Sequence, residues 1–215
     1  MPIKPNYNRA LLPTSLKDPF LNGCHLSGCS MKDDSSPIRP RGNWQAEALI
    51  IGEAAGQIEE RDNCTFIGPA GKLLEESLSL IGLSLDRDFL LINACLCRPH
   101  PIPGSQKENR TPTTAEISIC RTYVEKIINL HKPQLIIFVG GQSSKSILKN
   151  APTISHIAGT FLNNNETHFP IESDLYAILH PAFILRNFDE KQNWIYQLVR
   201  LRDYMIGRGL IRGSG

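Results

Sequence analysis

The sequence predicts an α/β fold, a three-layer α/β/α sandwich around a central parallel sheet of four strands. Four short apolar runs alternate with segments of helical pattern, and each run ends in glycine or polar residues. Connections long enough to hold a helix imply parallel neighbours and right-handed crossovers. A chain of 215 residues can also bury a core of its own, so we expect a single domain.

The predicted elements follow one another regularly from residue 48 onward. Apolar runs of four to six residues indicate buried strands, and leucines at helical spacing indicate amphipathic helices. Thr113 and Glu116 form a capping box at the start of one helix. In order, we expect a strand at 48–51, a helix at 69–83, a strand at 89–93, a helix from 113 to about 130, a strand at 134–139, a helix of about two turns, a strand at 175–179 and a helix from 190 to about 205.

The domain is expected to span residues 23–208, after an N-terminal arm at 1–22. The tail at 209–215 ends in IRGSG, which is typical of an expression tag. The chain has no run long enough to cross a bilayer and no signal-peptide pattern, which predicts a cytoplasmic protein without a membrane partner. A net charge of +2 leaves a DNA partner open without requiring one. We expect a monomer.

Polar side chains stand where three of the predicted strands end. Glu53 follows the first strand, Asn93 ends the second and His180 follows the fourth. The carboxyl ends of parallel strands share one edge of the sheet, and ligands collect at that edge. The sequence therefore predicts a site at which these three side chains converge.

Six segments in a fixed order resemble the uracil-DNA glycosylase superfamily, and within it the iron–sulfur branch called family 4. They are GEAAG, TFIGPAGKLLEESL, INACLCRP, NRTPTTAEISIC, PQLIIFVGGQSS and HPAFILR. The resemblance covers Gly52 to Arg186. It implies the uracil-DNA glycosylase fold and an enzyme that flips a nucleotide out of DNA and hydrolyses its N-glycosidic bond.

The resemblance also implies roles for the residues at the strand ends. Gly52, Phe66 and Asn93 become the base-binding residues, with Phe66 stacking on the base and the Asn93 amide reading uracil. His180 would stabilise the departing uracil anion, and Glu53 would orient the attacking water. Without the other motifs, each residue has a simpler interpretation. Phe66 could be a core residue, Asn93 and His180 could belong to turns at strand ends, and Glu53 could be a solvated loop residue.

Two further segments would contact DNA. Phe183, Ile184 and Leu185 resemble the family's wedge, which fills the gap left by the flipped base, with Arg186 near the phosphates. A short apolar run at this place could equally begin a buried helix. Gly141 and Ser143, in GGQSS, open a helix whose N–H groups could hold a phosphate.

The six cysteines indicate either metal binding or burial, because so many are unusual in a reducing compartment. The family resemblance assigns Cys24, Cys29, Cys97 and Cys120 to a 4Fe-4S cluster, with zinc on the same four sulfurs as the alternative. Cys64 and Cys95 have no role in the family and are expected to be unligated.

The chain departs from the family pattern at several places. Ala55 replaces a proline of the first motif, and Asn63 and Thr65 replace the usual glycine and proline before Phe66. We expect the loop at the pocket to be looser or wider for this reason. Four residues separate Cys24 from Cys29, where the family usually has two, and extra residues, HPIPGSQKE, follow the CRP motif.

Three functions therefore stay open on the sequence. The first is a monofunctional glycosylase that releases uracil from duplex or single-stranded DNA and leaves an abasic site, because no lysine is evidently placed for lyase chemistry. The second is a glycosylase that acts on a bulky modified pyrimidine, such as glucosylated hydroxymethylcytosine of phage DNA, in antiviral defence. The third is a non-catalytic iron–sulfur protein that binds DNA.

Overall fold

The protein is built around one mixed sheet of six strands with the order β1-β3-β2-β4-β6-β5. Its computed structural model describes residues 8–13, 24, 28–31, 35–101, 109–163 and 166–211. The four inner strands are parallel, and they are β2 (Ala48–Ala54), β3 (Phe89–Cys95), β4 (Leu135–Val139) and β6 (Asp174–Ile178). The predicted four-stranded parallel core is thus confirmed.

Two short antiparallel strands that the prediction omitted border this core. β1 (Arg41–Gly42) pairs with β3, and β5 (Phe161–Leu162) pairs with β6. Residues 8–13 of the predicted arm lie beside β1, where Ala10 N donates to Pro40 O. A strand of two residues is too short to show the alternation by which strands are predicted.

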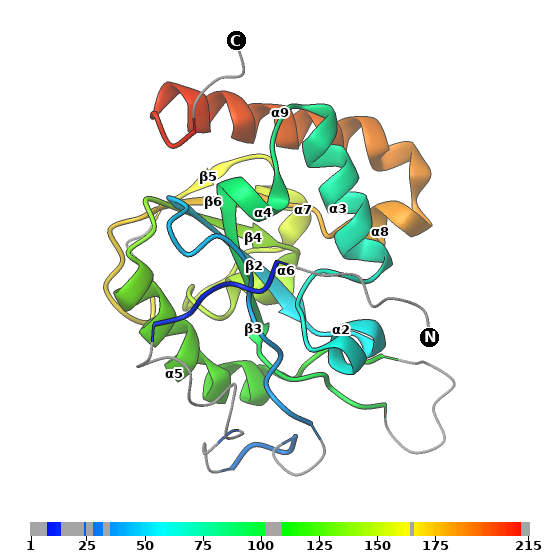
Figure 1. The fold of residues 1–215 in the computed structure, drawn as a ribbon, viewed down its shortest axis with the longest axis vertical. Helices are drawn as coiled ribbons and strands as arrows, with labels where there is room; N and C mark the ends of the chain where they lie inside the picture. The colour runs from blue at the N-terminus through cyan, green and yellow to red at the C-terminus, as the bar shows by residue number, and fades with distance from the viewer. Residues whose placement is uncertain are drawn as a thin grey trace.

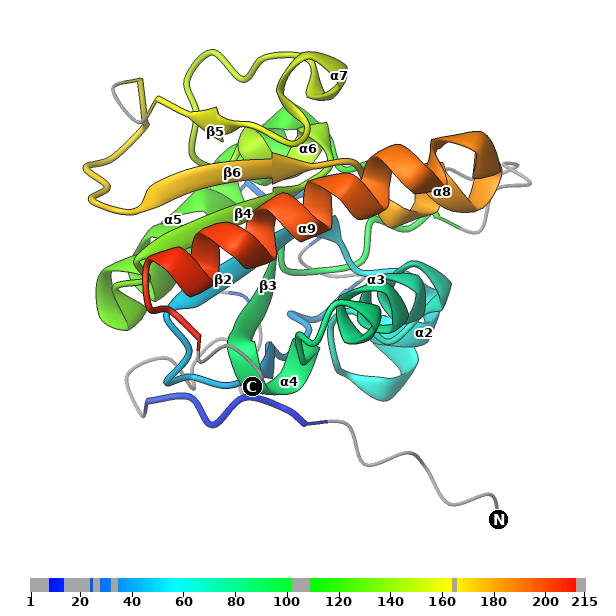
Figure 2. The ribbon, with the colours of Figure 1, turned by 90° about the horizontal axis from the view of Figure 1, so that it is seen from above.

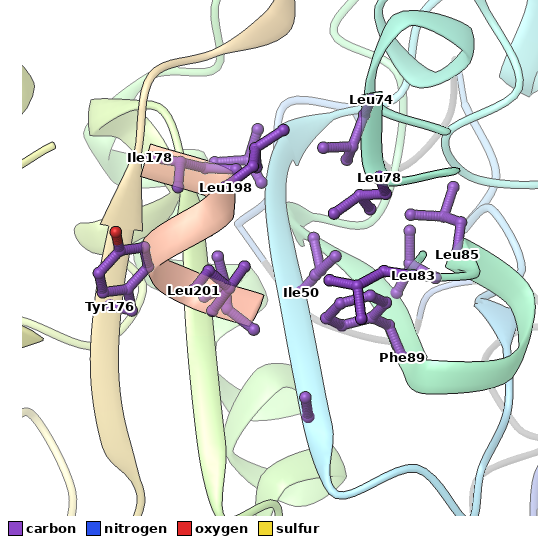
Figure 3. Close-up of a cluster of buried hydrophobic side chains, with 14 of the residues drawn as sticks. Ile50, Leu74, Leu78, Leu83, Leu85, Phe89, Tyr176, Ile178, Leu198 and Leu201 are labelled. Carbon is purple, nitrogen blue, oxygen red and sulfur yellow. The ribbon is translucent and has the colours of Figure 1, made fainter. Parts of the chain in front are cut away.

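Helices cover both faces of the sheet, which gives the predicted three layers (Figures 1 and 2). α5 (Thr114–His131) packs on one face through Ile117, Val124 and Ile127. The other face carries α3 (Pro69–Leu80), α4 (Leu85–Asp88) and α9 (Lys191–Gly207). Figure 3 shows the hydrophobic core between the sheet and these helices, where leucines of the helices pack on Ile50, Tyr176 and Ile178 of the sheet.

The remaining helices are short and lie near the strand ends. They are α2 (Gln57–Asp62), α6 (Gly141–Ser144), α7 (Ile154–Ile157), α8 (Pro181–Arg186) and the 3₁₀ turn η2 (Phe188–Glu190). α6 is a single turn of four residues, so the predicted helix of about two turns was wrong. Most of the predicted arm, residues 102–108 of the extra segment and residues 212–215 lie outside the described residues. Within the described ranges, no helix has both the length and the apolar character needed to cross a membrane.

Candidate active site

A cavity of about 490 Å³ opens at the carboxyl ends of β2 and β3, beside α3 and the start of α8. Glu53, Asn93 and His180 all line it, so the three strand ends meet as expected for a parallel sheet. The wall also includes Phe66 and, from a distant part of the sequence, Leu185 and Arg186 of α8.

Gly52 has no side chain, and this lets the side chains of Asn93 and Phe66 approach each other at the cavity. It lies opposite Asn93 in the register of β2 and β3. A Cβ atom on Gly52 would lie 2.4 Å from Asn93 Oδ1 and 2.6 Å from Cζ of Phe66. Both distances are shorter than van der Waals contact, so a larger residue here would displace the amide, the ring or both.

Phe66 has a backbone conformation that is unusual for a residue with a side chain. Its φ is 57°, in the left-handed region that favours glycine. Gly71 makes this turn possible, because a Cβ atom there would lie 2.1 Å from the carbonyl oxygen of Phe66. Surrounding structure must therefore hold the ring in place at the cavity.

Arg41 supplies much of that support. Its Nη1 donates to Phe66 O at 2.9 Å, and the guanidinium also pairs with Asp86 at 2.6 Å and with Glu75 at 2.8 Å. Burial alone would lower the pKa of Arg41, yet the pKa is raised because these two carboxylates stabilise the charge. The charged side chain thus joins β1, α3 and α4 to the Phe66 turn.

Asn93 presents its amide to the cavity from the end of β3. Its Nδ2 donates to Thr65 Oγ1 at 2.9 Å, and both residues are buried. The other N–H hydrogen and the oxygen Oδ1 are thereby left for a ligand. The amide can offer one donor and one acceptor side by side.

Glu53 is a half-buried carboxyl group at the end of β2. Burial raises its pKa, while a hydrogen bond from the side chain of Thr111 and the charge of Lys145 act in the opposite direction. Thr111 also lines the cavity. A half-buried carboxylate at the cavity wall is suited to binding a water molecule or facing a developing positive charge.

His180 is held as a neutral imidazole. Burial, with a contribution from the positive charge of Arg186, lowers its pKa to about 4. Its Nδ1 accepts a hydrogen bond from the Ala182 N–H at 3.1 Å, where it caps α8. The ring proton must therefore be on Nε2, which leaves one N–H donor that this contact does not use.

The loop beside the cavity is held by Glu59 of α2. Its Oε1 accepts from Gly68 N at 2.7 Å and its Oε2 accepts from Gly56 N at 3.2 Å. The loop is therefore pinned at both ends of this stretch. One carboxylate thus bridges the two sides of the loop, and the expectation that Ala55, Asn63 and Thr65 make it looser or wider than in the family stays a prediction.

Glu60 forms a second network on the outer side of α2. It accepts hydrogen bonds from Ser35 at 3.0 Å and from Arg98 at 2.9 Å, and it lies 2.7 Å from His100 Nε2. Arg98 also donates to Asn109 at 3.0 Å, and Asn109 lines the cavity. The network ties both flanks of the extra segment to the pocket loop.

The residues predicted to face DNA separate into two groups. Phe183 and Leu185 of α8 are 37% and 53% exposed, and Arg186 lines the cavity. Ile184 is only 1% exposed and packs in the core, because its position on α8 faces the sheet layer, so it cannot form part of a wedge in this structure.

The GGQSS segment was predicted to hold a phosphate through its backbone N–H groups. Ser143 is buried, and its hydroxyl donates to Gly140 O at 2.7 Å, so the side chain is not free for DNA. α6 is a single turn of four residues with Gly141 half-buried at its start, and the phosphate contact expected of the N–H groups stays a prediction.

Comparison of the sequence with known protein families gives the same family as the motifs. The sequence model described as "Uracil DNA glycosylase superfamily" matches residues 40–200, well over half of the chain. The chain belongs to the uracil-DNA glycosylase superfamily.

Curated relatives in this superfamily are similar over most of their length. A type-4 uracil-DNA glycosylase of Pyrobaculum aerophilum is 31% identical over 67% of this chain and 71% of the relative. A second, from Archaeoglobus fulgidus, is 32% identical over 67% and 69%. A third, from Thermotoga maritima, is 25% identical over 81% and 82%.

The four cysteines that the resemblance assigned to a cluster lie near one another in this superfamily member. Cys97 and Cys120 are buried, and Cys29 and Met31 pack beside them. Burial raises the pKa of Cys97, and the proximity of Cys120, Cys24 and Cys29 raises it further. The four thiols are therefore within electrostatic reach of one another.

Number, chemical type and grouping of these thiols fit a 4Fe-4S cluster. Among the residues that the structure describes, no three His, Cys, Asp or Glu side chains converge as the ligands of a single metal ion would. Each thiolate of a four-iron cluster binds a different iron, so such convergence is not needed. Cys95 is also buried, with its Sγ 3.9 Å from Cys120 Sγ.

The structure adds residues that the glycosylase motifs did not reveal. Arg41, Thr65 and Thr111 support Phe66, Asn93 and Glu53, respectively. The positive charge of Lys145 lowers the pKa of Glu53, and no sequence motif had singled out this lysine. For Glu59 there was a signal, since it stands three residues after Gly56, at the position where a capping glutamate reaches back to a helix start.

Proposed function

We propose that this protein is a monofunctional uracil-DNA glycosylase, which hydrolyses the N-glycosidic bond of a flipped deoxyuridine and leaves an abasic site. One observation carries the proposal: a single cavity combines the Phe66 ring, the Asn93 amide and a neutral His180. A flipped pyrimidine needs a stacking surface, a reader of its hydrogen-bonding edge and a donor for its leaving-group charge.

Asn93 would read the base. Its Oδ1 can accept from N3–H of uracil, and its unused N–H can donate to O4. Cytosine carries an acceptor at N3 and a donor at N4, so both contacts would become repulsive and buried polar groups would be left unpaired. The same amide therefore binds uracil and disfavours cytosine.

His180 would stabilise the leaving group. Because Nδ1 accepts from Ala182 and the ring is neutral, Nε2–H is the group that can donate to O2 of uracil. Negative charge grows on O2 as the glycosidic bond breaks, and a fixed donor stabilises that charge.

Glu53 would act on the sugar side. Its carboxylate would orient a water molecule and balance the positive charge that develops on the sugar as the bond lengthens. Thr111 donates to this carboxylate, and Lys145 supports its ionised form. The water supplies the hydroxyl of the abasic sugar, so no covalent enzyme intermediate is required.

The DNA would lie against α8. Phe183 and Leu185 are exposed side chains that can fill the space left by the flipped base, and Arg186 can pair with a phosphate. We expect the protein to do this as a monomer.

The cysteines would have a structural task. Bound to Cys24, Cys29, Cys97 and Cys120, a 4Fe-4S cluster would cross-link the N-terminal segment, the end of β3 and α5. The type-4 name of the relatives supports this assignment.

A base-release assay tests the proposal. Purified protein is incubated with duplexes and single strands that carry uracil, thymine, cytosine, hydroxymethylcytosine or its glucosylated form at one position, and the free base is measured by mass spectrometry. We expect uracil alone to be released, together with an alkali-labile abasic site. Release of only the glucosylated base, or DNA binding with no release of any base, would overturn the proposal.

A further inference from the structure

We propose that Thr65 is a positioning residue for base recognition, and that its hydroxyl fixes which way the Asn93 amide faces in the cavity. The inference rests on the proposed function, because it concerns how the same pocket distinguishes uracil from cytosine. It starts from one contact, the hydrogen bond of 2.9 Å from Asn93 Nδ2 to Thr65 Oγ1.

Both partners of this contact are immobilised. Thr65 is 2% exposed and Asn93 is 5% exposed, so water cannot readily replace either group. The Thr65 N–H donates to Arg39 O at 3.1 Å, and the next residue, Phe66, is held by Arg41. Thr65 Oγ1 is therefore a fixed acceptor at the cavity wall.

A second contact defines the opposite side of the amide. A Cβ atom on Gly52 would lie 2.4 Å from Asn93 Oδ1, so the α-hydrogen that occupies this direction points at the oxygen. A C–H group is a weak donor and favours an oxygen over an NH₂ group as its neighbour. Gly52 and Thr65 thus select the same orientation, with Oδ1 at β2 and Nδ2 at the loop.

This orientation determines what the base meets. One Nδ2 hydrogen is used by Thr65, so the amide presents the other hydrogen and Oδ1 in a fixed order. A cytosine would need the amide reversed. A hydroxyl can donate as well as accept, so Thr65 could pair with a reversed amide, but the NH₂ group would then face the Gly52 hydrogen. The two contacts together make reversal unfavourable.

Thr65→Val tests the inference because valine keeps the shape and removes the hydroxyl. We expect kcat/KM for uracil release to fall about five- to twentyfold, the scale of one buried hydrogen bond. Inhibition by free uracil should weaken by a similar factor, and the preference for free uracil over free cytosine as inhibitor should narrow. Thr65→Ser restores the hydroxyl and should return all three values to within about twofold of wild type.

A matched control separates positioning from general destabilisation. Ser173→Ala also removes a buried hydroxyl, which donates to Pro133 O outside the cavity wall, and should leave kinetics and inhibition unchanged. Affinity for abasic product DNA should be equal in all variants. If the valine variant does not fold, the same measurements are made on Thr65→Ser, which keeps the hydroxyl, and on Thr65→Ala, which lacks it. Wild-type values of release and inhibition in the variant without the hydroxyl would overturn the inference.

One readout does not need activity. The side-chain amide protons of Asn93, assigned by their absence from Asn93→Asp, should include one that exchanges slowly in wild type and rapidly in Thr65→Val. Equal exchange in both would contradict the role of Thr65, even for a protein that releases no base. Absence of uracil release from wild type would instead contradict the proposed function, so the two failures are distinguishable.

Discussion

The Arg41 guanidinium donates a hydrogen bond to the backbone carbonyl of Phe66 and so connects an edge strand to the ring that lines the cavity. The contact spans 25 residues of sequence and holds Phe66 at a φ of 57°. Because Arg41 is buried and paired with Asp86 and Glu75, the turn that carries Phe66 depends on a charged side chain in the core.

Arg41→Met should therefore lower both stability and activity. It leaves two carboxylates and one carbonyl without their donor, which we expect to cost about 2 kcal/mol or more in the free energy of unfolding. Uracil release should fall as Phe66 loses its support. Urea unfolding and single-turnover release measure the two effects. Arg202→Met removes the partner of Asp203 in an ion pair whose side chains are 32% and 58% exposed, and should cost less than about 1 kcal/mol. Equal unfolding midpoints in the two variants would contradict the role of Arg41.

Gly52→Ala should abolish most uracil release. The added methyl group would overlap Asn93 Oδ1 and the Phe66 ring, so we expect a loss of roughly 10² or more, as for misplaced catalytic groups. Gly207→Ala near the end of α9 meets nothing within 4 Å and serves as the control, with unchanged release and equal or slightly higher stability. A fully active Gly52→Ala enzyme would show that the amide and ring do not act from these positions.

His180 should matter for turnover and for the pH dependence of stability. His180→Ala should lower turnover by roughly 10² or more, the usual effect of removing one donor to a developing oxyanion. Unchanged turnover would remove His180 from the mechanism.

The stability effect follows from the lowered pKa of His180. Its ordinary value is 6.5 and its folded value is about 4, so between these pH values the unfolded chain binds a proton that the folded protein does not. The free energy of unfolding must then fall as the pH decreases from about 6.5 to about 4, and this part of the slope should be absent from His180→Gln. Urea titrations at a series of pH values would contradict this if wild type and variant showed parallel slopes.

Glu116 should stabilise the protein above its unfolded pKa. Bonds from Arg110, Ser30 and the Thr113 N–H outweigh burial and lower its pKa from 4.5 to about 2. Glu116→Gln should lower the free energy of unfolding by about 1–3 kcal/mol at neutral pH. The difference from wild type should shrink as the pH falls from 4.5 towards 2, because the folded carboxylate is then protonated. A difference that stays constant down to pH 3 would argue against an ionised Glu116 as the cause.

Cys97→Ala should cost iron, brown colour and thermal stability together, because a cluster ligand at the end of β3 ties several chain segments to one another. Cys64→Ala removes a buried thiol outside the cysteine group and should keep the iron. Metal analysis and the visible spectrum measure both variants. The cluster would be contradicted if the wild-type protein contained no iron or contained zinc instead. Normal iron content in Cys97→Ala would also contradict it.

The sequence was sufficient to predict the parallel core and the convergence of three polar side chains at one edge of the sheet. Glu53, Asn93 and His180 could be placed together because each follows a recognisable strand and parallel strands end at one edge. The capping box of Thr113 and Glu116 was also confirmed, since its pattern is local.

What could not be predicted depends on contacts between distant segments. Arg41 lies in a strand of two residues, and nothing in its surroundings shows that it reaches Phe66. Thr65 and Asn93 are 28 residues apart, and only the fold makes them neighbours. Ile184 was misassigned because three consecutive apolar residues do not show which of them faces the core of a short helix.

The most direct measurement of the central claim is single-turnover release of uracil by wild type and Asn93→Asp from the same duplex. An aspartate of similar shape offers an anionic acceptor where uracil O4 needs a donor, so we expect wild type to release uracil and the variant to lose roughly 10² or more in rate while still binding abasic DNA. Equal uracil release by both proteins would show that this cavity does not read its base through Asn93.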